Sequence, residues 1–325
     1  MTGGVRAAVL VAALVLTGLA GRPAVAQRPS AVRVGADNDA FSFWLPPWER
    51  TDRDYTSGVF GVVEYAGPAP WAWPQLAPDR PGTTHGYWIG QAIYTSDVEV
   101  VDGVAHARPD SRPNGAWLYL GLSSRDSTAA RVREWRVQAG VVGPPAFGKP
   151  MQDFFHSLGH EYQRPNDWSS QLPAEPGAVL RFIQTRPHWV VGEPSSWNAG
   201  LSSSLDVSVG TILTGASAGA RLWGALPEGL NTSQALVPRL VVGVEWTGHA
   251  VARDEFLDGT LFRESDHVRR IPFFDETAVS VGLRWRAVSA TYRAMRTGRQ
   301  YETQLQRSEW GSLTVEWRSG IGIRR

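Results

Sequence analysis

The chain has 325 residues, a formal net charge of +1 and no cysteine. The near-neutral charge argues against a nucleic-acid partner and against a strongly basic membrane surface. The absence of cysteine excludes a disulfide framework and a thiol nucleophile. The 15 tryptophans, 8 tyrosines and 11 phenylalanines are typical of outer-membrane β-barrels, which place aromatic side chains at both membrane interfaces.

Residues 1–26 have the pattern of a secretory signal peptide. Arg6 gives a positive start, an apolar run follows, and Ala24-Val25-Ala26 forms a small-x-small cleavage site. We expect cleavage to leave residues 27–325 as a single domain. No later stretch reaches about 18 uninterrupted apolar residues, which excludes ordinary helical membrane spans. An exported chain of this kind is either a periplasmic globular protein or an outer-membrane β-barrel of a Gram-negative cell.

The first strand-like run, residues 32–43, contains Asn38 and Asp39 side by side. Because successive residues of a strand face opposite sides, one of the two would point at lipid. A strand end, a bulge or a position near the rim would bring both to one site. The alternative is a turn formed by Asp37, Asn38 and Asp39. Oxygen donors of this kind also suit calcium.

The second strand-like run, residues 55–66, also alternates. One face carries Tyr55, Val59, Val63 and Tyr65. Thr56 therefore falls on the opposite, lumenal face, together with Gly58 and Glu64. On its own, a lumenal threonine usually belongs to a structural hydrogen-bond network.

Four long connections are rich in proline, glycine, tryptophan and charged residues: 44–54, 67–86, 97–113 and 143–175. Long loops of this kind normally lie on the extracellular side of an outer-membrane barrel, with tight turns on the periplasmic side. We therefore expect all four on the extracellular side.

Within the last of these loops, residues 151–160 have the periodicity of a short helix. One apolar face is formed by Met151, Phe154, Phe155 and Leu158. Pro150 suits the first helical turn and Gly159 suits the end. Gln152 and His156 are four residues apart and project together from a second face. Histidine accepts a proton near neutral pH, so His156 is a candidate general base; the alternative is a surface helix with a solvated histidine.

Strand-like alternation recurs in five further segments: 133–141, 205–209, 240–247, 279–287 and 313–318. In the clearest of them, Val279, Val281, Leu283 and Trp285 oppose Ser280, Arg284 and Arg286. A face with so many charged residues would disrupt the dry core of a sandwich. It suits a barrel with a polar lumen and an outer face in lipid. The alternative is an antiparallel sandwich with polar outer faces, which shows the same alternation.

Six ordered blocks resemble the outer-membrane lipid A 3′-O-deacylase family. They are DNDAF at 37–41, TDRDYTSG at 51–58, GQAIYT at 90–95, RPNGAWLYLG at 112–121, GP at 143–144 leading to QDFFH at 152–156, and WSSQL at 168–172 followed by EP at 175–176. Together they extend from residue 32 to about residue 180. The C-terminal half matches only as generic barrel strands.

The resemblance implies a twelve-stranded barrel with an active site near the outer rim, on a short helix of an extracellular loop. Calcium-dependent ester hydrolysis would there remove the 3′-linked acyloxyacyl group of lipid A. By position, His156 would be the general base that activates water, and Gln152 would position water or substrate. Asn38 and Asp39 would line the site, with Asp39 as a calcium ligand. Thr56 would be a further polar residue of the lining.

The chain departs from the family pattern at two places. Ala92 stands where the family usually carries a basic residue, and Asn114-Gly115-Ala116 replaces the middle of an Arg-Pro-Tyr-Ala-Gly-Trp block. If the family's basic residue meets a lipid A phosphate, Arg112 or Lys149 would supply that contact here.

Three functions follow from the sequence as alternatives. The first is hydrolysis of an acyl ester of lipid A, with lipopolysaccharide and the surrounding outer-membrane lipids as partners. The second is an outer-membrane phospholipase that applies similar chemistry to glycerolipids. The third is a non-catalytic barrel, either a pore or a structural protein. The sequence has no HExxH zinc helix and no GxGxxG phosphate loop.

Overall fold

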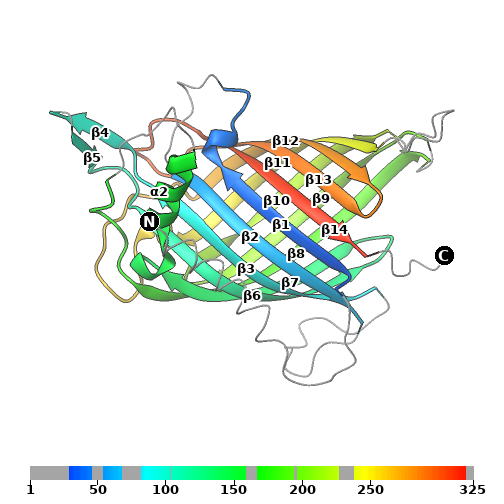
Figure 1. Ribbon diagram of the computed structural model, residues 1–325, viewed down its shortest axis with the longest axis horizontal. Coiled ribbons are helices and arrows are strands. Elements are labelled where there is room, and N and C mark those ends of the chain that lie inside the picture. Colours follow the sequence, from blue (N-terminus) through cyan, green and yellow to red (C-terminus); the bar gives the residue numbers. More distant parts are fainter. Residues whose placement is uncertain are drawn as a thin grey trace.

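The structure is a computed structural model that describes residues 29–45, 54–67, 82–102, 104–158, 167–193, 196–226 and 238–319. Within these residues, twelve antiparallel strands close into a barrel (Figure 1). The first strand pairs with the last, with Ala31 opposite Arg318, and this pairing completes the ring. The prediction of an all-β barrel is confirmed, and the two-sheet sandwich is excluded.

The barrel strands are β1 (Ala31–Asn38), β2 (Asp54–Ala66), β3 (Thr84–Thr95), β6 (Gly115–Ser127), β7 (Val132–Val142), β8 (Glu175–Gly192), β9 (Asn198–Gly210), β10 (Leu213–Ala225), β11 (Arg239–Asp254), β12 (Phe273–Trp285), β13 (Val288–Thr297) and β14 (Ser308–Arg318). A separate hairpin consists of β4 (Val98–Val101) and β5 (Val104–Ala107). Short helices in the connections are η1 (Asp39–Phe41), η3 (Pro144–Ala146), α2 (Gly148–Leu158) and α3 (Glu255–Asp258). None of the described helices is both long and apolar enough to cross a bilayer.

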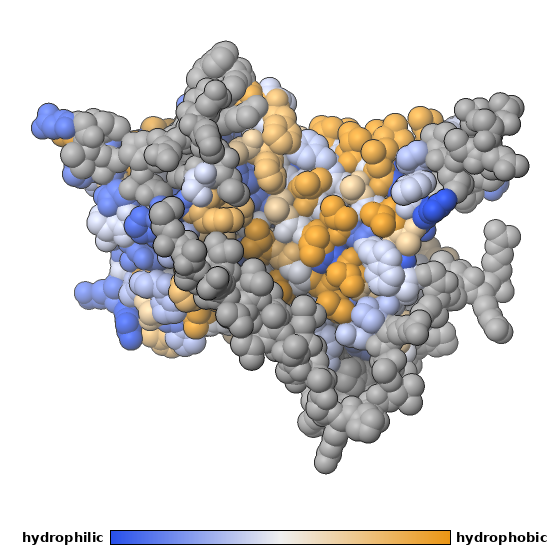
Figure 2. All heavy atoms as spheres, in the orientation of Figure 1, coloured by the Kyte–Doolittle hydropathy of each residue, from blue (hydrophilic) through white to orange (hydrophobic). Residues whose placement is uncertain are grey.

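The outer face of the wall carries the predicted apolar rows. Side chains exposed there include Val209, Val242, Val244, Trp246, Val279, Val281, Leu283, Leu313 and Trp317. Figure 2 shows apolar residues gathered over the middle of the wall. A soluble sheet would have buried these rows, so their exposure identifies the surface that lipid covers.

The inner face is lined by charged residues that pair with one another. Arg33 binds Glu64 at 2.6 Å and Glu316 at 3.0 Å, and so joins β1 to both of its neighbours. Arg136 lies 3.6 Å above the ring of Trp88 and pairs with Glu134. Because these charges have partners, they are tolerated inside the barrel.

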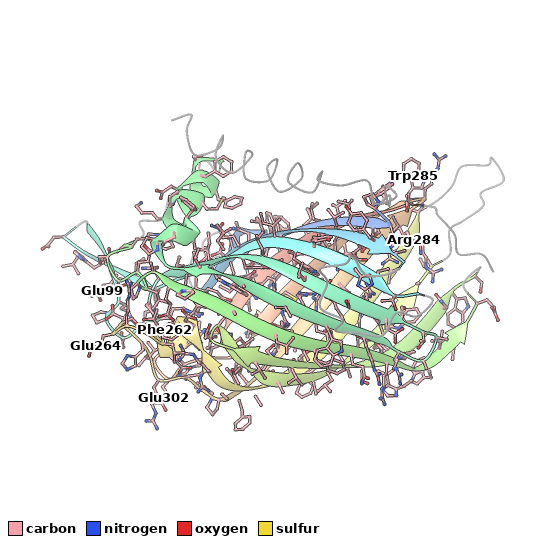
Figure 3. All side chains as sticks on the ribbon, turned by 90° about the horizontal axis from the view of Figure 1, so that it is seen from below. Glu99, Phe262, Glu264, Arg284, Trp285 and Glu302 are labelled. Atoms are coloured by element: carbon pink, nitrogen blue, oxygen red, sulfur yellow. The ribbon has the colours of Figure 1, made fainter. Side chains whose placement is uncertain are left out.

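The strand connectivity defines two ends of the barrel. Strands β1, β3, β7, β9, β11 and β13 all end at the same end of the barrel, here called the loop end. Figure 3 labels Glu99, Phe262, Glu264 and Glu302 there, and Arg284 and Trp285 at the opposite end. The loop 67–86 was expected beside the other long loops; its residues 68–81 lie outside the described part of the chain, but β2 and β3, which border it, meet it at the opposite end of the barrel. Ala66 pairs with Thr84 at the end where Ala31 begins β1, because successive connections of an up-and-down barrel alternate between its ends.

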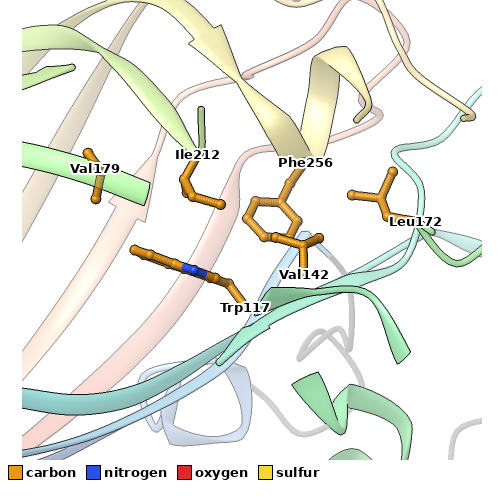
Figure 4. Packing of buried hydrophobic residues seen from close by; sticks show 6 residues of the cluster. All are labelled: Trp117, Val142, Leu172, Val179, Ile212 and Phe256. Atoms are coloured by element: carbon orange, nitrogen blue, oxygen red, sulfur yellow. The ribbon is translucent and has the colours of Figure 1, made fainter. Parts of the chain in front are cut away.

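An apolar cluster occupies the lumen at the loop end (Figure 4). It consists of Trp117, Val142, Leu172, Val179, Ile212 and Phe256. Phe256 belongs to α3, and its ring stacks on Tyr94 of β3 at a centroid distance of 4.1 Å. The lumen therefore changes from a charged interior to an apolar one as it approaches the loops.

Candidate active site on the outer wall

Helix α2 lies outside the barrel, against β3 and β6 (Figures 1 and 3). Beneath it, Ile93, Ala116 and Ala146 are buried together, with Met151 and Trp168 packed against them. Ile93 and Ala116 are the chain neighbours of Tyr94 and Trp117, which pack in the lumen cluster. Because neighbours along a strand face opposite sides, the α2 contact is on the lipid-facing surface of the wall.

The predicted helix is present, and its apolar face is only partly used for packing. Met151 packs on the wall, whereas Phe154 is 39% exposed and contacts the ring of Phe155. The side chain of Leu158 lies outside the described residues. The exposed Phe154 is on the side of the barrel that meets lipid, so it adds to the apolar surface there.

Two contacts hold the start of α2 close to the wall. The amide Nε2 of Gln91, on β3, donates to the carbonyl oxygen of Ala146. A Cβ on Gly148 would lie 2.6 Å from the ring of Trp168 and 2.7 Å from the Cβ of Ala116. Glycine is needed at this position because no larger residue permits so close an approach.

Gln152 is held at the interface between α2 and the wall. Its side chain is only 2% exposed, and its Oε1 accepts a hydrogen bond from Nε1 of Trp168 at 2.8 Å. The indole therefore fixes the carbonyl end of the amide. No periodic pattern in the sequence indicated this contact, since Trp168 lies outside the helix and outside any strand.

The segment that carries Trp168 is fixed by Asn114. The buried Asn114 accepts from the backbone N–H of Ser96 at 2.9 Å and donates to the carbonyl of Asp167. The backbone N–H groups of Ala107 and Ser169 hydrogen-bond the Asp167 carboxyl and hold its pKa below the usual value. Asn114, a departure from the family pattern, thus has a clear structural role.

Asn38 and Asp39 lie where β1 ends at the rim. Oδ1 of Asn38 accepts from the backbone N–H of Ala40 at 2.8 Å and caps η1, and Asp39 is the buried first residue of η1. The sequence left a strand end and a turn as two alternatives for these residues, and the structure has both. They bring both residues to the rim beside β2, where Asn38 pairs with Ser57.

Thr56 was expected on the lumenal face, and this is wrong. A bulge between Tyr55 and Ser57 interrupts the alternation of β2. Oγ1 of Thr56 contacts Oγ1 of Thr95, which follows the lumen-facing Tyr94 and therefore lies on the outer side. Tyr55 turns into the lumen instead, where its hydroxyl donates to Asp37 at 2.8 Å.

Asn38, Thr56 and Gln152 thus lie on neighbouring elements along the rim of the outer wall. The end of β1 adjoins the bulge of β2, Thr56 contacts the end of β3, and Ile93 of β3 packs beneath α2. His156 belongs to α2, one turn beyond Gln152, but its side chain lies outside the described residues. Its catalytic role stays a prediction.

The two candidate phosphate contacts lie in different places. Lys149 is exposed on the first turn of α2 and pairs with Asp153 at 2.9 Å. Arg112 is 0% exposed, lies 4.5 Å from the ring of Tyr94 and donates to the carbonyl of Phe256 at 3.4 Å. Arg112 is therefore on the lumen side of the wall, while Lys149 is on the side of Gln152.

The family's basic residue at position 92, which is Ala92 here, would not belong to the outer site. Ala92 pairs with Gly58 and Trp117, and it alternates with the outward Gln91 and Ile93. It therefore faces the lumen. A basic side chain at this position would point away from α2.

The described residues contain no group of three or more His, Asp or Glu side chains arranged as metal ligands. The donors at the end of β1 nevertheless suit calcium in kind, because Asp39 is a buried carboxylate followed by the backbone carbonyls of η1. Asn38 uses its Oδ1 for the cap of η1.

A serine-hydrolase spacing, GxSxG, occurs at residues 215–219, but it lies within β10. A nucleophilic serine of this motif needs a sharp strand-to-helix turn. Ser217 pairs with Asp206 and His249 on the neighbouring strands, and Asp206 is bound by Arg181. This segment therefore has the geometry of a regular strand and not of a nucleophile site.

Comparisons with known proteins agree with this architecture. A model of the outer membrane protein LpxR family matches residues 9–319. Among solved structures, LpxR from Salmonella typhimurium is similar, with a TM-score of 0.69 and 18% sequence identity over 89% of this chain and 100% of that chain. The β domain of the Bordetella autotransporter BrkA has a TM-score of 0.43 and 9% identity over 89% of this chain and 98% of that one. No curated protein sequence matches the chain significantly.

Proposed function

The chain belongs to the outer membrane protein LpxR family, and on that premise we propose that it is an ester hydrolase that removes the 3′-acyloxyacyl group from lipid A. The observation that carries this proposal is the position of the amide of Gln152. It is oriented by Trp168 on the lipid-facing side of the barrel rim. A site on this surface is accessible to a membrane lipid without the lipid leaving the bilayer.

The wall beneath α2 supports a lipid substrate. Leu120 and Val141 are exposed on the outer face of β6 and β7, and Phe147 and Phe154 are exposed on the α2 segment. An acyl chain can lie against such a surface while its ester reaches the more polar rim. A lumenal site would not allow this, because the described lumen is lined by ion pairs and closed by an apolar cluster at the loop end.

The proposed chemistry is direct hydrolysis by an activated water. His156 takes a proton from the water as it attacks the ester carbonyl, and then returns a proton to the leaving alkoxide. Gln152, whose Oε1 is held by Trp168, would position the water or the substrate. Asn38 and Thr56 would line the site, and Lys149 would meet a phosphate of lipid A. Calcium, where bound, would be held by Asp39 and would supply positive charge for the developing oxyanion.

The proposal is tested by mass spectrometry of lipid A from cells with and without the protein. We expect loss of the acyloxyacyl mass with the native chain and its retention with His156→Ala, a decrease in rate of about 10²–10⁴-fold. The matched control is His267→Ala, which removes an exposed histidine of the β11–β12 connection. Chelation of calcium should abolish the reaction, and activity that survives chelation would remove calcium from the proposal.

The other two functions give different results in the same cells. An unchanged lipid A profile with fatty acid released from phospholipids would identify a phospholipase. No change in either lipid pool, together with ion conductance in planar bilayers, would identify a pore.

A further inference from the structure

A short segment closes the loop end of the lumen. Residues 254–262, here called the lumen cover, comprise the end of β11, α3 and the residues after it. Phe256 stacks on Tyr94, and Leu257 packs against Val268 and Tyr301. The cover is thus part of the apolar cluster at the loop end. The contacts that hold the cover against the wall therefore decide whether the loop end stays closed.

Two buried carboxyl groups meet where the cover joins the wall. Glu175, the first residue of β8, accepts from the backbone N–H of Leu261 at 2.8 Å and of Phe262 at 3.1 Å. Glu255, the first residue of α3, is 0% exposed and is next to Glu175. Neither oxygen of Glu255 receives a hydrogen bond from a donor among the described residues. Two buried carboxylates that face each other repel unless a proton or a cation lies between them.

The hydrogen bonds around the pair indicate a proton. Two N–H donors aim at Glu175, so this carboxyl is arranged as the acceptor. The same donors direct positive charge at the pair, which disfavours a metal ion. A calcium ion also needs about six to eight oxygen ligands, some of them usually water. Both carboxyl groups are buried, so this site offers few such ligands.

Arg253 is a cation that acts on Glu255, and its guanidinium is already hydrogen-bonded to two backbone carbonyls. Its Nε donates to the carbonyl of Thr211 at 2.9 Å, and its Nη2 donates to the carbonyl of Gly259 at 2.9 Å. Asp254, the other charged neighbour, caps α3 by accepting from the N–H of Phe256. We propose that Glu255 carries a proton which it donates to Glu175, and that this shared proton holds the lumen cover closed.

The pKa of Glu255 agrees with this geometry. Burial, the neighbouring Glu175 and, to a smaller extent, Asp254 raise it and Arg253 lowers it, and the result is a pKa of about 8. In an open cover, Glu255 would be exposed to water and would have an ordinary pKa of about 4.3. Between these two values the closed state binds a proton that the open state lacks. The ratio of closed to open cover therefore falls about tenfold per pH unit from about pH 5 to pH 8, and is constant above pH 8.

Hydrogen exchange of the intact protein in lipid nanodiscs measures this ratio. The amide hydrogens of Glu255, Leu261 and Phe262 bond across the seam between cover and wall. We expect their protection factors, corrected for intrinsic exchange at each pH, to fall about tenfold per unit from pH 5 to pH 8. Glu255→Gln, whose amide still donates to Glu175, should remove this slope. Glu264→Gln, an exposed carboxyl of the same connection, should keep it.

Three results would overturn the proposal. One is a protection factor of the native cover that does not change with pH, which needs no variant to observe. Another is an unchanged slope in Glu255→Gln. The third is a loss of protection on chelation at constant pH, which would place a cation where we place the proton. Because exchange is measured without substrate, its outcome does not depend on whether the protein hydrolyses lipid A.

Discussion

Residues that are neighbours in sequence on β3 and β6 belong to two different environments. On the outer side, Ile93 and Ala116 pack beneath α2, where Trp168 orients the amide of Gln152. On the lumen side, Tyr94 and Trp117 belong to the apolar cluster at the loop end, and ion pairs line the rest of the lumen. The proposed function places the chemistry on the lipid side, while the lumen side supports the scaffold. Substitutions matched across the wall test this division.

The largest effect is expected at Gln152. Gln152→Ala removes an amide held on the outer side, and we expect the rate of lipid A deacylation to fall by about 10²-fold or more. Gln138→Ala removes an equally buried amide from the lumen side of β7, and we expect a change of less than about threefold. Deacylation assays on purified protein measure both. Equal losses in the two variants would contradict the division between the faces.

A smaller effect is expected when the amide of Gln152 is kept but loses its hydrogen bond from Trp168. Trp168→Phe keeps most of the packing but deletes the N–H that binds Oε1 of Gln152. We expect kcat to fall about tenfold with little change in KM, because only the orientation of the donor is lost. Trp117→Phe is the lumen counterpart, since its Nε1 has no hydrogen-bond partner among the described residues. If kcat fell as much in Trp117→Phe as in Trp168→Phe, a positioning role of Trp168 would be refuted.

The smallest effect on activity, but a clear effect on stability, is expected at Arg33. Arg33→Met leaves the carboxylates of Glu64 and Glu316 without their shared partner inside the barrel. The free energy of unfolding should fall by about 3 kcal/mol, whereas the deacylation rate should stay within about threefold of the native value. Urea unfolding of the barrel, followed by tryptophan fluorescence, measures the first. A large loss of activity without loss of stability would assign the lumen a direct part in catalysis.

Much of the fold was predictable because it depends on local periodicity. The rows around Val279 and Leu313 alternate with a period of two residues, and the structure exposes their apolar members to lipid. The helix containing Gln152 was predictable from a period of 3.6 residues for the same reason. The family blocks then indicated which residues of the outer rim to consider together.

The errors arose where one residue or one connection changed the pattern. A single bulge at Thr56 moved that hydroxyl to the outer side, and no periodic signal reports a bulge. The loop 67–86 has the composition of an extracellular loop, but its end of the barrel is set by strand connectivity. Trp168 could not be linked to Gln152, since the two are 16 positions apart in the sequence and no periodic pattern connects them.

The sequence by itself determined the alternating strands, the short helix and the residues available for chemistry, because these follow from the spacing of side chains along a strand or a helix turn. Only the tertiary structure decided on which side of the wall each group lies and what holds it there. Gln152 with Trp168, and Glu255 with Glu175, are pairs from segments far apart in the chain. They meet because the barrel closes and its loops fold back on it, and contacts of that kind have no local pattern to reveal them.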